Sequence, residues 1–172
     1  MIPTEFNAGE FFRALTDKNR LCREHGFRFR VVSDLEGFAD TISEPESYTP
    51  LVCVSDTSAG AYSVDNAPAM RTVKTVFLYM PIDIQQDWIT QRQEAFRIMK
   101  EIFRQFLSVL ILQKTALDHA GAYIDPEIRF TEIDRHFHTG GACAYFQISI
   151  DKTTDLILRQ EEWTQDPTAK EP

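Results

Sequence analysis

The sequence contains few of the residues from which catalytic and metal-binding motifs are built. It has 3 cysteines and 4 histidines among 172 residues. Cys22, Cys53 and Cys143 lie too far apart for a zinc motif or a disulfide framework, and such a pattern is typical of a reducing cytoplasm. Neither a nucleophile elbow (G-x-S-x-G) nor a glycine-rich phosphate-binding or dinucleotide-binding motif occurs. The motifs therefore predict no catalytic residue and no cofactor.

Basic charge and long apolar runs are also scarce. The net charge is −8 and the isoelectric point is about 5.0, whereas nucleic-acid-binding proteins usually carry a basic patch. We therefore expect no nucleic acid as the main ligand. The apolar run at residues 106–112 is far shorter than the roughly 20 residues of a membrane span. Glu5 and Glu10 interrupt the N-terminal region, where no signal-peptide core follows. We expect a cytoplasmic protein without a membrane partner.

Helical periodicity is the strongest pattern that the sequence does have, and it covers residues 83–114. Asp83 and Gln86 have the spacing of a capping box, while Asp87 at the start and Lys114 at the end suit the helix dipole. Apolar residues recur with a period of 3.6 rather than 2, namely Phe96, Met99, Ile102, Phe103, Phe106, Leu107 and Leu110. This predicts one helix over residues 84–113, roughly 45 Å long at about 1.5 Å per residue.

The end of this predicted helix, residues 106–112, is apolar on nearly every side and is broken only by Ser108. Such a segment must be covered on several sides. Either loops of the same chain or a second subunit could cover it. The second possibility predicts a homo-oligomer whose interface uses Phe106, Leu107, Leu110 and Ile111.

The N-terminal half predicts a helix, a strand and an irregular insertion. Asn7 and Glu10 resemble a capping box and Gly26 a helix stop, so we expect one helix over residues 8–25. Residues 27–31 alternate apolar and basic side chains, as in a half-exposed strand. Proline and glycine punctuate residues 33–72. There we expect an insertion with a hairpin, its strands at 51–54 and 61–64 and its turn at 56–60.

The C-terminal half predicts further strands. Residues 73–80 are rich in β-branched and aromatic side chains and predict a central strand. A strand over 127–137 should contain a bulge near Thr131 or Glu132, where the side-chain alternation changes. A turn at 139–141 then leads into a strand over 142–150, and a short strand over 155–159 is expected last. In the strand over 142–150, we expect Ala144, Phe146, Ile148 and Ile150 to face inward and Cys143, Tyr145, Gln147 and Ser149 to face outward.

Together these elements predict a single α+β domain over residues 1–163, followed by a disordered tail at 164–172. We expect an antiparallel or mixed sheet of about four to six strands. The long helix and the N-terminal helix should pack on one face of that sheet.

One constellation could bind a metal ion. Asp134, His136 and His138 alternate along the predicted strand, so their side chains would share one face. Two histidines and a carboxylate at this spacing are possible metal ligands, and Cys143 on the paired strand could lie nearby. The other interpretation is the polar end of a hairpin beside its turn.

The layout from residue 73 onward resembles the tail terminators and tail-completion proteins of tailed phages. The strand TVFLYMPID, the long helix and the hairpin EIRFTEIDRHFHTGGACAYFQISI carry the resemblance, which covers roughly 100 residues. It implies a non-enzymatic structural protein that forms a ring and contacts other tail or neck proteins. Such a protein would be cytoplasmic during assembly and part of the virion afterwards. The resemblance carries over no functional residue.

Two other classes of function stay open. One is a metal-dependent enzyme that uses Asp134, His136 and His138, for which titratable groups should converge in a cleft. The other is a regulatory module that binds a small ligand in an apolar pocket of a few hundred Å³.

Overall fold

The computed structural model describes residues 6–43, 48–64, 68–83, 85–133 and 140–164. In chain order its elements are α1 (Ala8–Lys18), α2 (Arg20–Glu24), β1 (Arg28–Val32), α3 (Leu35–Ser43), β2 (Leu51–Ser55), β3 (Ala59–Ser63), β4 (Ala69–Pro81), α4 (Trp88–His119), β5 (Ala122–Ile124), β6 (Phe130–Ile133), β7 (Gly141–Thr153) and a 3₁₀ turn (Gln160–Glu162).

Two long antiparallel strands form the centre of the sheet. β4 and β7 are 13 residues each and pair continuously, from Ala69 opposite Thr153 to Pro81 opposite Gly141. β2 and β3 both pair with β4 at different positions along it, and β5 and β6 do the same along β7. β1 is parallel to β2, so the sheet is mixed. The predicted α+β class is confirmed, with seven strands in the described residues where about four to six were expected.

The long helix is confirmed as one unbroken element, α4, of 32 residues. It begins and ends later than predicted. Asp87 is its N-cap and accepts a hydrogen bond from the backbone N–H of Thr90 at 3.3 Å. Asp83, the predicted cap, instead accepts from the N–H of Gln85 at 2.9 Å in the preceding turn.

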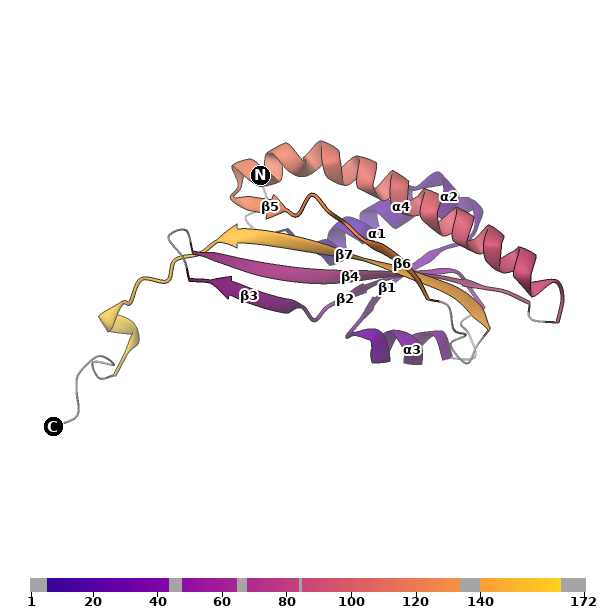
Figure 1. The fold of residues 1–172 in the computed structure, drawn as a ribbon, viewed down its shortest axis with the longest axis horizontal. Helices are drawn as coiled ribbons and strands as arrows, with labels where there is room; N and C mark the ends of the chain where they lie inside the picture. The colour runs from indigo at the N-terminus through magenta and orange to yellow at the C-terminus, as the bar shows by residue number, and fades with distance from the viewer. Residues whose placement is uncertain (1–5, 44–47, 65–67, 84, 134–139, 165–172) are drawn as a thin grey trace.

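α1, α2 and α4 lie on one face of the sheet and bury the larger core (Figure 1). Phe12 of α1 is central to it, with ring centroids 5.8 Å from Phe106 of α4 and 5.6 Å from Phe146 of β7. The predicted single N-terminal helix is wrong at Asn19, whose extended backbone ends α1. The Asn19 side chain then accepts a hydrogen bond from the N–H of Cys22 and caps α2.

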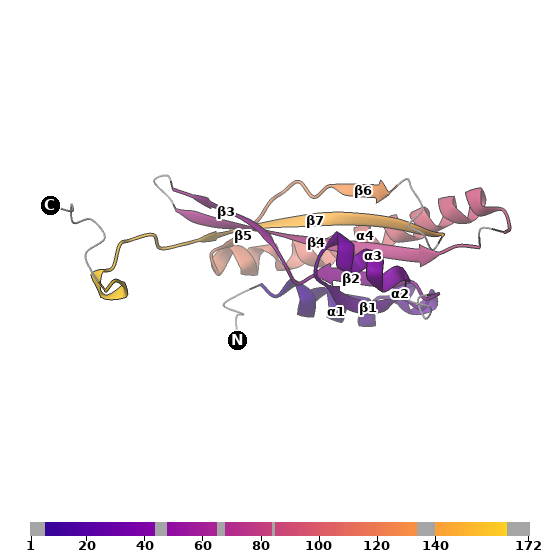
Figure 2. The same cartoon turned by 90° about the horizontal axis from the view of Figure 1, so that it is seen from below.

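The opposite face of the sheet carries α3, a helix that the sequence analysis did not predict (Figures 1 and 2). Phe38 of α3 stacks on Phe77 of β4, with ring centroids 4.5 Å apart. Cys143 lies in this second core and is 1% exposed. The prediction that Cys143 faces outward is therefore wrong, because α3 covers the face to which it points. Tyr145, on the same face, is half-buried for the same reason.

Residues 33–72 contribute to the sheet itself and are not an appendage to it. All five residues of β2 are buried, and this strand lies between β1 and β4. The predicted hairpin between residues 51–54 and 61–64 is wrong, because β2 and β3 each pair with β4. β3 forms its antiparallel pairing with the first part of β4, from Ala59 opposite Val73 to Ser63 opposite Ala69.

The predicted pairing of the strands at 127–137 and 142–150 is confirmed by β6 and β7. Other predictions for this part of the chain are wrong. β6 pairs with β7 in continuous register from Phe130 opposite Phe146 to Ile133 opposite Cys143, so no bulge occurs at residues 131 or 132. Residues 155–159 form no strand. The predicted turn residue Thr139 and the predicted tail after residue 164 lie outside the described residues.

Candidate functional site

The sheet is covered unequally along its length. At one end, which we call the packed half, α1 and α4 lie on one face and α3 on the other (Figures 1 and 2). The other end, which we call the open half, consists of β3, β5, residues 69–73 of β4 and residues 149–153 of β7. All five residues of β3 are exposed. β3 is therefore the strand of the open half that is available to a partner, whereas Ala122 and Ile124 of β5 are buried in the core.

A lysine fixes the position at which the chain enters the open half. The Nζ atom of Lys74 donates hydrogen bonds to the backbone carbonyls of Asp56 at 2.6 Å, Thr57 at 3.2 Å and Ser55 at 3.3 Å. The Ser55 hydroxyl accepts a further bond from the N–H of Thr75 at 3.1 Å. These bonds hold the connection between β2 and β3, so that β3 pairs farther along β4 than β2 does.

Large apolar side chains are exposed on β3, on the residue after it and on β5. Tyr62 is 61% exposed, Val64 81% and Tyr123 52%. Tyr62 lies opposite Met70, whereas Tyr123 lies opposite Asp151, so the two tyrosines belong to opposite faces of the sheet. Tyr62 and Val64 therefore lie at a different edge of the sheet from Tyr123.

The structure divides the predicted interface on α4 into buried and exposed residues. Phe106 and Leu110 are 1% and 3% exposed and belong to the protein's own core. This placement corrects the prediction for these two side chains. Leu107 is half-buried against the same core, whereas Ile111 is 68% exposed and its neighbour Leu112 is 81% exposed. Ile111 and Leu112 are therefore the available apolar surface of this helix.

Residues 154–163, which we call the C-terminal arm, extend away from the body at the end of the molecule where β3 lies (Figures 1 and 2). The N–H of Thr154 donates to the carbonyl of Pro68 at 3.1 Å, and this bond marks the point of departure. The large apolar side chains of the arm are all substantially exposed, and they are Leu156, Ile157, Leu158 and Trp163. Sequence analysis missed this feature because it placed residues 155–159 in the sheet.

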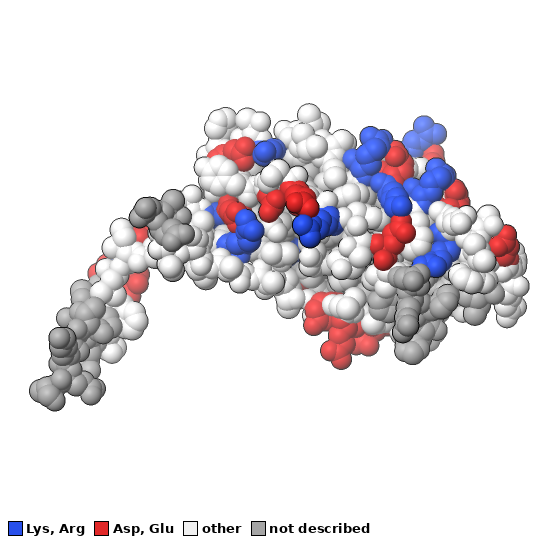
Figure 3. All heavy atoms as spheres, in the orientation of Figure 1, with Lys and Arg blue, Asp and Glu red and all other residues white. Residues whose placement is uncertain are grey.

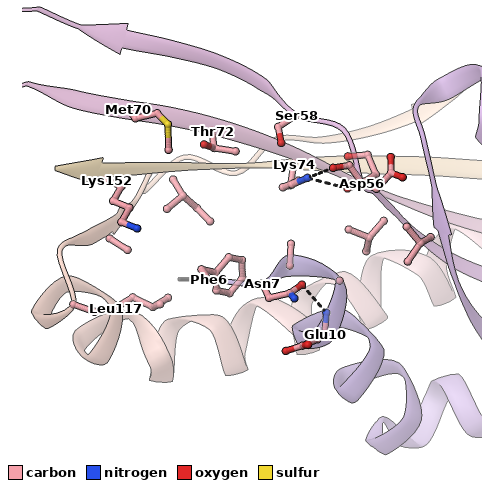
Figure 4. Close-up of a pocket in the computed structure, with 18 residues that line it drawn as sticks. Phe6, Asn7, Glu10, Asp56, Ser58, Met70, Thr72, Lys74, Leu117 and Lys152 are labelled. Carbon is pink, nitrogen blue, oxygen red and sulfur yellow. Dashed lines mark hydrogen bonds between the residues drawn. The ribbon is translucent and has the colours of Figure 1, made fainter. Parts of the chain in front are cut away.

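A groove of about 750 Å³ crosses the helical face of the open half. In Figure 4, Met70, Thr72 and Lys74 of β4 lie across from Phe6 and the start of α1. Ile150 and Lys152 of β7 and Leu117 of α4 also line it. The groove forms because α1 begins here and leaves this part of the sheet face uncovered. Its lining mixes apolar side chains with the charged groups of Glu10, Asp56, Lys74 and Lys152, so it could hold an amphipathic molecule or peptide segment.

Charged side chains on the other face of the open half are paired. Arg71 donates two hydrogen bonds to Asp151, at 2.7 and 2.8 Å, and lies 3.8 Å from Asp125. The hydrogen bond from Arg71 lowers the pKa of Asp151 below its usual value. On the face seen in Figure 3, Lys and Arg side chains gather over the first half of α4, interspersed with Asp and Glu, as in the pairs Arg97–Glu94 and Arg104–Glu101. β3 itself carries no charged residue.

The three cysteines are poor nucleophiles in this structure. Burial raises the pKa of Cys22 and of Cys53 to about 12 and also raises that of Cys143. Their thiols therefore stay protonated near neutral pH, and the thiolate is the reactive form.

The predicted metal ligands Asp134, His136 and His138 lie outside the described residues. Within the described part of the chain, no group of three histidine, cysteine or acidic side chains has a metal-binding arrangement. The described helices include none that is both long and apolar enough to cross a membrane.

The sequence matches no protein-family model, and a search of curated proteins also finds no match. The functional interpretation therefore depends on the geometry of the open half and on the layout of the chain.

Proposed function

We propose that this protein is a non-enzymatic assembly protein of a phage-like tail or neck. In this proposal it self-associates into a ring and contacts neighbouring tail or neck proteins. It would assemble in the cytoplasm and become part of a phage-like particle.

The observation that carries the proposal is the contrast between one end of the sheet, which is covered on both faces, and the other, where every residue of β3 is exposed and α4 covers β5 on one face only. The open half exposes Tyr62, Val64 and Tyr123, and the arm beside it exposes Leu156 to Leu158. Isolated apolar residues are normal on protein surfaces, but contiguous strand edges with apolar side chains favour association. The resemblance of layout to tail terminators agrees with this use of the surface.

The oligomeric state tests the self-association part of the proposal. We expect multi-angle light scattering over a concentration series to show one defined oligomer, and electron microscopy to show closed rings. A monomer at every concentration would contradict the proposal. The variant Tyr62→Ser should keep the thermal unfolding temperature while weakening the oligomer, because Tyr62 is 61% exposed. Tyr48→Ser is the matched control, since Tyr48 is 86% exposed but precedes β2 at the opposite end of the sheet.

The neighbouring genes test the phage-like context. Tail-tube or portal genes beside the coding gene would support the proposed class. A gene neighbourhood of metabolic enzymes would count against it.

The groove favours a second candidate, a module that binds a small amphipathic ligand. Lys152 and Met70 lie at the end of the groove away from Glu10 and Asp56 (Figure 4), so an apolar carboxylic acid matches that end. We would screen a panel of such acids by thermal shift. A compound that stabilises the protein but not a groove-filling Met70→Trp variant would support this candidate, and no stabilisation by any member would count against it.

A further inference from the structure

The outer edge of β3 differs from the other edges of the sheet. β1, at one edge, carries the exposed residues Arg28 and Arg30, and β6 carries Glu132. β5 is only 3 residues long. Charged side chains and short length are the usual means by which edge strands avoid pairing with other chains. β3 spans 5 residues with the sequence AGAYS, and it has neither charge nor proline.

β3 is also open in the structure. Its one sheet partner among the described strands is β4. The backbone groups on its other side can therefore form a ladder with an added strand. Every residue of β3 is exposed, so no described helix or strand covers its faces.

The C-terminal arm contains an apolar segment for such an added strand, and pairing would replace the bond that the N–H of Ile157 donates to Asp155. Residues 154–159 continue directly from β7 but have no strand pairing of their own. Leu156, Ile157 and Leu158 are 47%, 75% and 45% exposed. An arm that exposes three successive large apolar side chains gains stability when it pairs and packs against another surface.

The direction of the arm indicates that this surface belongs to another copy of the chain. The arm departs beside Pro68, at the end of the β3–β4 pair. Both views show it running away from the sheet, not back along it (Figures 1 and 2). To reach its own β3 edge, the arm would have to reverse direction and pass around the ends of β4 and β3. A neighbouring copy requires no such reversal.

We infer that the arm of one copy adds as a strand to the outer edge of β3 in the next copy. Donor and acceptor are different surfaces, so copies can repeat the contact head to tail, and this generates a ring when the rotation between copies closes. This inference rests on the proposed self-association and specifies the segments through which it occurs.

Disulfide trapping between two separate variants tests the contact. One protein carries Tyr62→Cys on β3, and the other carries Ile157→Cys on the arm. After the two proteins are mixed, dissociated by dilution and reassembled, mild oxidation at pH 8 should yield the mixed disulfide-linked dimer. The native cysteines do not interfere, because Cys22, Cys53 and Cys143 are all buried. Tyr48→Cys replaces Tyr62→Cys in the control mixture and should yield no mixed dimer above background.

Removal of residues 155–172 is the second measurement. We expect the truncated protein to be monomeric and to keep the thermal unfolding temperature of the full-length monomer, because the arm contributes no strand to its own sheet. A truncated protein that still forms the full-length oligomer would overturn the inference.

Other outcomes separate this inference from the proposed function. A defined oligomer without the mixed dimer would overturn the arm contact and leave self-association standing. Disulfides between two Tyr62→Cys chains would show β3 pairing with β3 and would also overturn it. In a single chain that carries both Tyr62→Cys and Ile157→Cys, an intramolecular disulfide in a monomer would show the arm on its own β3 and would overturn the inference. A protein that stays monomeric throughout would overturn both proposals.

Discussion

The same two strands, β4 and β7, run through both halves of the sheet, but the halves differ in how they are covered. In the packed half, Val76 to Tyr79 of β4 are at most 3% exposed, because α1 and α4 cover one face and α3 the other. In the open half, residues 69–73 of β4 are half-buried or exposed. The sequence reflects this difference. Four consecutive apolar residues mark burial on two faces, whereas Arg71 to Lys74 mix polar and apolar side chains, as expected for partial exposure.

The largest effect should come from neighbouring substitutions on α4. Leu110 is 3% exposed and Ile111 is 68% exposed. Leu110→Glu places a carboxylate in the apolar core and should reduce the free energy of unfolding by more than about 4 kcal/mol. Ile111→Glu should change it by less than about 0.5 kcal/mol while weakening self-association. Urea unfolding and light scattering measure the two effects.

The comparison fails if both α4 variants unfold the protein, since Ile111 would then be part of the core. It also fails if Leu110→Glu is tolerated, because Leu110 would then lie on an accessible surface.

A smaller effect tests whether α3 covers the second face of the packed half. Phe38 is fully buried and stacks on Phe77, so Phe38→Ala should lower the free energy of unfolding by about 3–5 kcal/mol. Leu35, on the same helix, is 53% exposed, and Leu35→Ala should cost less than about 1 kcal/mol. Similar costs in chemical denaturation for both variants would show that α3 does not pack as described.

Two glycines provide a third comparison between the halves. A side chain at Gly141 would overlap the ring of Tyr79, which is 1% exposed and enclosed by other side chains. Gly141→Ala should therefore lower the free energy of unfolding by about 1–3 kcal/mol, because the added methyl group overpacks this site. At Gly60, on the open β3, an added methyl group would lie 3.3 Å from the Arg71 carbonyl oxygen. This exposed strand can shift, so Gly60→Ala should change the stability by less than about 1 kcal/mol. Equal changes in the unfolding midpoint would contradict this difference.

The sequence predicted those parts of the fold whose hydrophobic pattern is strong. The period of 3.6 over α4 and the dense apolar run of β4 identified the central helix and strand. α3 was missed because its sequence, LEGFADTIS, contains glycine and few strong helix formers. Its formation depends instead on Phe38 and Ile42, which pack against the sheet in the second core. The prediction that Cys143 faces solvent was wrong for the same reason, because α3 covers that face.

The candidate site was less predictable than the fold. The apolar end of α4 was identified. Because this end is apolar on nearly every side, its sequence does not show which side packs against the sheet, so Phe106 and Ile111 were grouped together. The position of β3 depends on the bonds of Lys74 to three carbonyls, which leave no periodic signal. The arm was taken for a strand because residues 156–158 are apolar. That pattern does not show whether the pairing partner belongs to the same chain.

The smallest expected effect on stability at neutral pH is that of the ionisation of the thiols, which all lie in the packed half. Burial raises the pKa of Cys22 and Cys53 from 9.0 to about 12, which reduces the thiolate fraction at pH 8 by roughly 1,000-fold. We expect a thiol reagent to label the native protein very slowly and all 3 cysteines rapidly in guanidinium chloride.

A cysteine introduced in the open half away from β3, Tyr123→Cys, is the matched control and should react at the rate of an exposed thiol, because Tyr123 is 52% exposed. The folded protein retains thiol protons that the unfolded chain releases above pH 9. The contribution of these groups to stability is therefore complete below pH 9 and declines as the pH rises toward 12. Rapid labelling of the native cysteines at pH 8 would show that the packed half opens readily, and the distinction between the two halves would then lose its physical basis.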